Sequence, residues 1–382
     1  MGITPHQPEP CPGSFAHFSA VRRFPALDGL RAASVLLVVT VHLHSEAWRP
    51  LVGEQGVTAF FVLSGFIITT LLIREEAAAG RISLRGFYVR RAFRIVPLYA
   101  VVLGAYVVAV LGLGLEGDKR PGLEYALPYF LTFTNEIVLF GDAFRNQIPF
   151  FQSWSLGVEE KFYVVWPLIG FLVLRRAWRG VALAVVTLGV CLVQVTVHPD
   201  WTSWYEPILV GCLLAVLLHD ARTFAWLARL ARGGWVVAAL AALAGAHVLL
   251  NYDERLGEAL YPFIVAALIV GLVLGDSPVR RVLGGPLAVH VGRRAYGIYL
   301  VHILAINAVD LLILPDATFT PATVANLLAA VALSYAVADG LHRTVERPLI
   351  TVGRRVAARF GPGPAPGTVG TADPGDLRPV SS

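Results

Sequence analysis

The sequence is divided into apolar runs of close to 20 residues, which are separated by short polar segments. About 20 residues of helix rise roughly 30 Å, the thickness of the hydrocarbon core of a bilayer. Only 15% of the residues are charged, whereas soluble domains carry roughly a quarter. The sequence therefore predicts an all-α, polytopic integral membrane bundle.

Ten apolar runs qualify as transmembrane helices, and the charges between them indicate the orientation. Cytoplasmic segments of membrane proteins are rich in arginine and lysine. With the N-terminus inside, the inner segments hold 24 arginines and the outer segments five basic residues. We therefore expect about ten transmembrane helices with both termini in the cytoplasm. The expected spans are 30–46, 57–73, 95–115, 155–174, 181–197, 205–219, 234–251, 259–275, 295–314 and 322–341.

Three regions follow from this pattern. Residues 1–20 are polar and are expected to be a flexible N-terminal segment, and 21–350 form the transmembrane domain. Residues 351–382 are expected to be a cytoplasmic, largely disordered tail, because the chain from Gly361 onward is rich in Gly, Pro and Asp. The outer segment 116–154 is half apolar, so it fits either an interfacial segment or an eleventh membrane element.

The composition argues against several classes of function. The net charge of +5 reflects arginines in loops, as membrane orientation requires, and no nucleic-acid motif accompanies them. Cys11, Cys191 and Cys212 have no metal-ligand spacing. We therefore expect no metal, no bound cofactor and no nucleic-acid partner, and a lipid bilayer as the environment.

Ionisable side chains within an apolar run are costly and mark candidate functional sites. Arg31 and His42 are eleven residues apart in the first run, so on a helix they share one face and lie about 16 Å apart along its axis. That spacing suits the two ends of one long ligand. His44 points in another direction. A histidine considered alone fits an internal hydrogen bond equally well.

Polar residues in the next two segments have structural alternatives. Ser64 lies in a run with Gly56 and Gly65, where close helix packing is the better interpretation and a nucleophile the weaker one. Arginines crowd the following inner loop, where a positive-inside anchor explains most of them. Arginine also suits phosphate, which makes a clamp for a phosphate-rich cosubstrate the functional interpretation. The candidates for this clamp are Arg90, Arg91 and Arg94.

The fourth run begins SWSLGVEEKFYVVWP. Glu159 and Glu160 are adjacent, so one is expected to orient a histidine or bind a hydroxyl, and the other to pair with Lys161 or cap the helix. The sequence does not separate the two. Trp154, Ser155 and Tyr163 surround them, and an aromatic belt at the membrane interface accounts for part of this pattern.

The ninth run carries a second buried histidine. Tyr299 and His302 are three residues apart and share a helix face. A hydrogen bond to another span and a role in the site explain His302 about equally well.

Six motifs stand in a fixed order: LDGLRA with His42 following, GVTAFFVLSGFII, RRAFRIVPLY, SWSLGVEEKFYVVWP, GRRAYGIYLVHI and VERPL. Over about residues 24–350 the chain thereby strongly resembles the acyltransferase-3 superfamily of membrane O-acyltransferases. The chain looks like a stand-alone form, without the extra soluble hydrolase-like domain that many polysaccharide-modifying relatives carry.

The resemblance implies transfer of an acyl group from acyl-CoA to a hydroxyl in a bacterial plasma membrane. Typical acceptors of the family are surface polysaccharides, lipopolysaccharide sugars, and macrolide or other secondary-metabolite glycosides. The family's arginine–histidine signature falls on Arg31 and His42, and its later tyrosine–histidine motif on Tyr299 and His302. Its arginine group and its tryptophan–serine–glutamate motif fall on Arg90, Arg91, Arg94, Trp154, Ser155 and Glu159.

The mechanism expected from this resemblance starts at the cytoplasmic end. Arg31 and the Arg90–Arg94 group hold the phosphates of acyl-CoA, and His42 acts as general base on the acceptor hydroxyl. Glu159 or Glu160 orients His42 or the acceptor, and His302 helps to bind a substrate. An acyl-histidine relay is the variant within this interpretation. The alternatives from other classes are a transporter or flippase of a lipid-linked or acidic substrate, and a structural membrane subunit.

Overall fold

The computed structural model describes residues 14–21, 23–115, 117–140, 148–250, 253–314 and 316–361, and it is helical with no strand in those ranges. The elements are α1 (Phe15–Ala20), α2 (Pro25–His42), η1 (Glu46–Leu51), α3 (Gln55–Ala79), α4 (Leu84–Val107), η2 (Val108–Gly112), η3 (Gly117–Lys119), α5 (Arg120–Leu131), η4 (Asn135–Phe140), η5 (Phe151–Ser153), α6 (Trp154–Leu168), η6 (Ile169–Val173), α7 (Arg176–Thr196), α8 (Asp200–Leu218), α9 (Ala221–Leu230), α10 (Trp235–Leu250), α11 (Glu254–Leu274), α12 (Pro278–Leu283), α13 (Pro286–Gly292), α14 (Ala295–Asp310), α15 (Pro321–Leu341), η7 (His342–Glu346), α16 (Arg347–Ala357) and η8 (Ala358–Phe360).

Each of the ten expected spans falls on one of these helices. Within the described ranges, seven helical segments are long and apolar enough to cross a membrane: Pro25–His42, Glu46–Ala79, Leu84–Gly112, Arg176–Thr196, Asp200–Leu218, Glu254–Leu274 and Pro321–Phe360. The bent pair α9–α10 makes eight if it is one broken span. The chain is thus a multi-pass helical membrane protein, while the number ten and the sides of the termini stay predictions.

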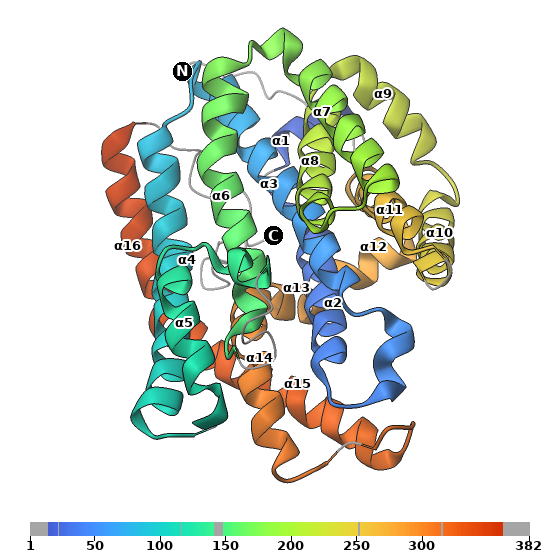
Figure 1. The fold of residues 1–382 in the computed structure, drawn as a ribbon. Coiled ribbons are helices and arrows are strands. Elements are labelled where there is room, and N and C mark those ends of the chain that lie inside the picture. Colours follow the sequence, from blue (N-terminus) through green and yellow to red (C-terminus); the bar gives the residue numbers. More distant parts are fainter. Residues whose placement is uncertain are drawn as a thin grey trace, which may run out of the picture.

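The long helices pack into a bundle in which neighbours in space are often distant in sequence (Figure 1). Helix α3 crosses α8, and α16 lies along α4 on the left of the view. Helices α14 and α15 lie side by side at its lower end, and α10 packs on α11 at the right. Helix α2 contacts α3, α13 and α14, so it stands between two parts of the bundle.

The crossing of α3 and α8 depends on one glycine from each helix. A Cβ on Gly65 would overlap the backbone oxygen of Ile208, and a Cβ on Gly211 would overlap that of Val62. Small residues allow such close approach in membrane helices. The packing interpretation of Gly65 is therefore correct.

The outer face of the bundle is apolar. On α7 the exposed residues Val181, Val185, Leu188 and Leu192 recur at helical spacing, whereas Leu183, Thr187 and Gln194 on the other face are buried. A helix that exposes one apolar stripe and buries polar groups on the opposite side fits lipid outside and protein inside. This pattern supports the membrane assignment independently of the length of the helices.

Three segments outside the long helices differ from, or refine, the sequence expectation. Part of the N-terminal segment is packed, because Phe18 of α1 is buried and Arg74 donates to the Val21 and Phe18 carbonyls at 2.7 and 3.0 Å. In the outer segment, α5 has 12 residues, too few to cross a bilayer. The first part of the expected tail continues as helix to Phe360, and residues 362–382 lie outside the described residues.

Candidate active site

Helix α2 carries Arg31 and His42 on one inward face. The helix runs unbroken from Pro25 to His42, which keeps the separation along its axis at about 16 Å. Val35 and Val38 lie between the two residues on the same stripe, and both are fully buried. Arg31 also forms an ion pair with Asp28, one turn earlier, at 3.2 Å. The two residues of the signature therefore share the face that looks into the bundle.

The side chain that contacts His42 is the imidazole of His302 on α14. It is not the carboxylate of Glu159 or Glu160, which the sequence had suggested for this place. His42 Nδ1 lies 3.3 Å from His302 Nε2, and the ring centroids are 4.8 Å apart. His42 Nδ1 is also 2.9 Å from the Val38 carbonyl, and His302 Nδ1 is 2.6 Å from the Tyr299 carbonyl. Both imidazoles are thus fixed by a backbone oxygen of their own helix.

Tyr299 links the histidine pair to α6 and to the segment before it. Its hydroxyl donates to the backbone oxygen of Gln152 and lies 2.7 Å from Ser155 Oγ. The Gln152 amide in turn donates to the Leu300 carbonyl at 3.1 Å. Since all of these groups are buried, the bonds fix α14 against η5 and the start of α6.

A second polar cluster lies one turn further along α6. The hydroxyls of Ser64 and Tyr163 hydrogen-bond to the Glu159 carboxylate, and the charges of Arg91 and Arg31 act on it. Ser64 and Tyr163 also bond to each other. Arg31, Arg91 and Glu159 are each partly buried and not fully enclosed.

Glu160 has a different environment from Glu159. The charges of Arg91 and Glu159 act on it, but its buried Oε1 has no hydrogen-bond partner within the described part of the chain. Lys161 pairs instead with Glu136, and donates to the Phe133 and Gly157 carbonyls at 2.9 and 3.0 Å. The expected pairing of Lys161 with a neighbouring glutamate is therefore wrong, because Lys161 fastens η4 to α6.

The expected arginine group divides into two kinds. The charges that act on Arg94 include those of Arg31, Arg91 and Glu346, and the Arg91 guanidinium lies 4.1 Å from the centre of the Tyr163 ring. These arginines join the Glu159 cluster. Arg90 instead forms an ion pair with buried Glu75 at 3.0 Å, which ties α4 to α3.

Trp154, the remaining candidate, serves packing between helices. Its ring centroid lies 6.1 Å from that of Phe61 on α3 and 5.3 Å from that of Trp204 on α8. Trp154 thus packs α6 against α3 and α8, on the helix that carries Glu159.

The polar groups thus form one line through the bundle on α2, α3, α4, α6 and α14. Arginines occupy one end, Glu159 with its two hydroxyls follows, and the histidine pair occupies the other end. The family model of acyltransferase-3, which describes an acyltransferase domain, matches residues 24–339. The chain belongs to the acyltransferase-3 family.

Three curated relatives that this acyltransferase-3 chain resembles carry the names of O-acetyltransferases. Peptidoglycan O-acetyltransferase of Listeria monocytogenes is 25% identical, with 85% of this chain and 55% of the relative covered. A protein of Bacillus subtilis named "Putative peptidoglycan O-acetyltransferase" is 28% identical, with 88% and 56% covered. One of Staphylococcus aureus named "Putative O-acetyltransferase" is 26% identical, with 77% and 52% covered.

This acyltransferase-3 chain spans about half the length of these relatives. No solved structure matches it. The family model describes an acyltransferase domain, and the three relatives are bacterial proteins named as O-acetyltransferases, two of those names beginning with "Putative".

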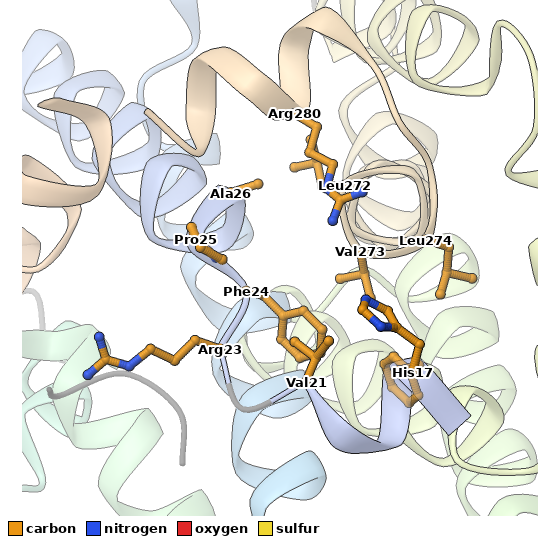
Figure 2. A pocket seen from close by; sticks show the side chains of 11 residues that line it. His17, Val21, Arg23, Phe24, Pro25, Ala26, Leu272, Val273, Leu274 and Arg280 are labelled. Atoms are coloured by element: carbon orange, nitrogen blue, oxygen red, sulfur yellow. The ribbon is translucent and has the colours of Figure 1, made fainter. Parts of the chain in front are cut away.

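A separate cavity of about 90 Å³ lies at the N-terminal end of α2 (Figure 2). His17 of α1, Phe24 and Arg280 line it, together with Leu272 and Val273 of α11. Figure 2 shows Arg23 extending away from Arg280. A space of this size holds a few water molecules, and none of the residues that line it belongs to the polar line.

Sequence reasoning did not select three residues that the fold brings to the polar line. Glu346 acts on Arg94 and bonds to His342 at 2.7 Å; Tyr296 donates to the Ile95 carbonyl at 2.9 Å; and Gln152 holds Tyr299. Glu346 stands in VERPL and Tyr296 in GRRAYGIYLVHI, so these acyltransferase-3 motifs contained the signal.

Among the described residues, no group of three His, Cys, Asp or Glu side chains is placed to hold a metal ion.

Proposed function

We propose that this chain transfers an acyl group from acyl-CoA to a hydroxyl of a cell-envelope glycan. The observation that carries the proposal is the line of polar groups between Arg31 and the pair formed by His42 and His302. A long donor with phosphates at one end and a reactive carbonyl at the other matches such a line. The names of the curated relatives favour an acetyl group and a glycan acceptor over the secondary-metabolite glycoside that the sequence also allowed.

The donor phosphates bind at the arginine end. The charges of Arg31 and Arg91 act on both Arg94 and Glu159, so these arginines converge there. Asp28 and Glu346 also neighbour them, and a planar guanidinium additionally matches phosphate oxygens. Arg90 takes no part in this binding because Glu75 already holds it. The pantetheine arm then runs along α2 for about 16 Å, which brings the thioester to His42.

His42 acts as the general base at the other end of the line. Its Nε2 removes the proton of the acceptor hydroxyl while the oxygen attacks the thioester carbonyl, which forms the ester C–O bond. The C–S bond then breaks, and the thiolate of CoA takes the proton back from His42. Glu159, held by Ser64 and Tyr163, binds a polar group of the donor or the acceptor, and Glu160 lies beside it.

The orientation that goes with this mechanism has about ten spans and both termini in the cytoplasm. The 24 arginines of the inner segments support it, and so does the position of Arg31 at the beginning and His42 at the end of α2. In this orientation the arginine end meets cytoplasmic acyl-CoA, and the histidine pair lies toward the outer face. Labelling of single cysteines placed at Gly114 and Gly233 with a membrane-impermeant reagent tests it: Gly114→Cys reacts in intact cells and Gly233→Cys does not.

The activity is tested with purified protein in lipid nanodiscs, acetyl-CoA labelled in the acetyl group, and short peptidoglycan glycans. The expected result is a labelled glycan ester and free CoA in equal amounts. An acetylated protein that accumulates without acceptor would replace the direct transfer by the acyl-histidine relay. If acetyl-CoA is neither bound nor consumed, the donor is wrong, and movement of a lipid-linked substrate without acetyl-CoA would support the transporter alternative.

A further inference from the structure

We infer that His302 is the positioning residue of His42: it fixes the tautomer of His42 and accepts a hydrogen bond from the imidazolium that forms during catalysis. This inference rests on the proposed function. It makes His302 a hydrogen-bond acceptor for His42, in place of the substrate-binding role that the resemblance suggested.

The backbone contacts determine which nitrogen of each ring carries the proton. A carbonyl oxygen only accepts, so the 2.6 Å contact with the Tyr299 oxygen requires a proton on His302 Nδ1. A neutral His302 therefore presents a lone pair on Nε2. The 2.9 Å contact of His42 Nδ1 with the Val38 oxygen likewise requires a proton on His42 Nδ1.

These two assignments fit each other at the contact between the rings. The proton on His42 Nδ1 is shared between the Val38 oxygen and the lone pair of His302 Nε2, 3.3 Å away. His42 Nε2 then keeps its own lone pair free for a substrate proton. The hydrogen bond at one ring nitrogen thus decides which nitrogen serves as the base.

Burial separates the roles of the two rings. His302 has no exposed surface, whereas His42 is only partly buried. A substrate therefore reaches His42 and not His302. His302 resembles in position the buried aspartate of a Ser-His-Asp triad, which orients its histidine and stabilises the imidazolium.

An uncharged acceptor suits this place in the bundle. A carboxylate with no exposed surface in an apolar bundle is costly to keep ionised. An imidazole lone pair accepts the same hydrogen bond without a resident charge. Tyr299 is anchored to Gln152 and Ser155, and its carbonyl oxygen holds His302 Nδ1, which fixes the orientation of the ring.

The test compares the wild type with His302→Leu and His302→Gln in nanodiscs. Leucine fills the volume but accepts no hydrogen bond, whereas the glutamine amide oxygen reaches the place of Nε2. We expect His302→Leu to lower kcat about 100-fold with KM for acetyl-CoA changed less than about threefold, and His302→Gln to recover at least about tenfold of that loss.

The pH profile supplies a readout that a purely structural role would not move. In His302→Leu the acid limb of kcat shifts toward lower pH, because the imidazolium has lost its acceptor. The other titratable groups whose charges act on His42 are Glu54 before α3 and His44, and both are the same in all three proteins. Equal loss in the Leu and Gln variants with an unmoved profile, or a kcat of His302→Leu within threefold of wild type, overturns the inference.

A spectroscopic measurement keeps the inference testable apart from the reaction. Nitrogen-15 NMR of histidine-labelled protein reports which ring nitrogen is protonated, and His42→Gln identifies the His42 signals. We expect His42 to be protonated at Nδ1 in the wild type and to lose that preference in His302→Leu. If the wild type transfers no acyl group, the proposed function fails, while this tautomer still decides the inference. A wild-type His42 protonated at Nε2 overturns it.

Discussion

His42 Nδ1 lies 3.3 Å from His302 Nε2, although 260 residues separate the two in the chain. His44, only two residues after His42, is exposed and instead contacts Asp310 at 2.6 Å. Two histidines of one segment therefore have different surroundings. His42 faces the polar line of the bundle, and His44 belongs to the loop that follows α2.

This difference predicts opposite outcomes for two similar variants. His42→Ala is expected to lower kcat for acetyl transfer by about 10²–10⁴-fold, the range for loss of a general base. His44→Ala keeps kcat within about twofold, because His44 is exposed and lies outside the polar line, and a contact made by an exposed side chain contributes little to the fold. Steady-state assays with labelled acetyl-CoA measure both, and a fully active His42→Ala would remove His42 from the mechanism.

The arginines of α4 should separate into substrate and structural residues. Arg94→Gln and Arg31→Gln are expected to raise KM for acetyl-CoA about tenfold or more, since a hydrogen bond to a charged group contributes roughly 1.5–3 kcal/mol. Arg90→Gln leaves KM unchanged, but it leaves the buried Glu75 carboxylate unpaired.

The Arg90→Gln variant should therefore unfold more easily, by about 1–3 kcal/mol. Thermal unfolding in detergent, followed by intrinsic tryptophan fluorescence, reports the stability of all three variants. A rise of KM in Arg90→Gln equal to that in Arg94→Gln would contradict the division of the group.

The crossing of α3 and α8 predicts sensitivity to a single methyl group. Gly65→Ala forces the added Cβ against the Ile208 backbone, which is expected to lower the free energy of unfolding by about 1–3 kcal/mol. Gly189→Ala on α7 is the matched control, since nothing lies within 4 Å of its added Cβ. Equal melting temperatures for the two variants would show that the crossing is looser than described.

His219, which follows α8, predicts a loss of stability in acid. Burial, chiefly, lowers the pKa of His219 from 6.5 to about 4, and its ring packs on Phe18 at 4.9 Å. The unfolded chain binds the proton more readily than the folded chain does. The stability that neutral His219 contributes is therefore fully present above pH 6.5 and declines as the pH falls toward 4.

The neutral, buried His219 contributes at most about 3–4 kcal/mol to the free energy of unfolding. Thermal unfolding of wild type and His219→Gln between pH 7.5 and 4.5 measures it, and the difference between the two proteins should shrink as the pH falls. A constant difference over this range would mean that His219 does not titrate with unfolding.

The sequence predicted the features that depend on local pattern. All ten apolar runs fall on helices. A long apolar segment in lipid must hydrogen-bond its backbone N–H and C=O groups internally, and a helix does this. Arg31 and His42 share a face of α2 because the period of the helix fixes it. Six ordered motifs predicted the family, which the match over residues 24–339 confirms.

Local pattern could not distinguish residues that are alike in sequence. Arg90 and Arg94 share a helix face and a charge, yet Glu75 holds the first and Glu346 acts on the second. Lys161 follows two glutamates and pairs with Glu136 instead. Each partner comes from another segment, so no spacing along one helix could identify it.

The sequence by itself therefore determined a multi-pass helical protein of the acyltransferase-3 family and the candidate groups along α2, α6 and α14. Only the tertiary structure placed His302 against His42 and gave Glu159, rather than Glu160, the hydroxyls of Ser64 and Tyr163. The physical reason is the range of the interactions. Hydropathy and helical period act within a segment, whereas hydrogen bonds between buried side chains require two helices to meet at one depth and one rotation.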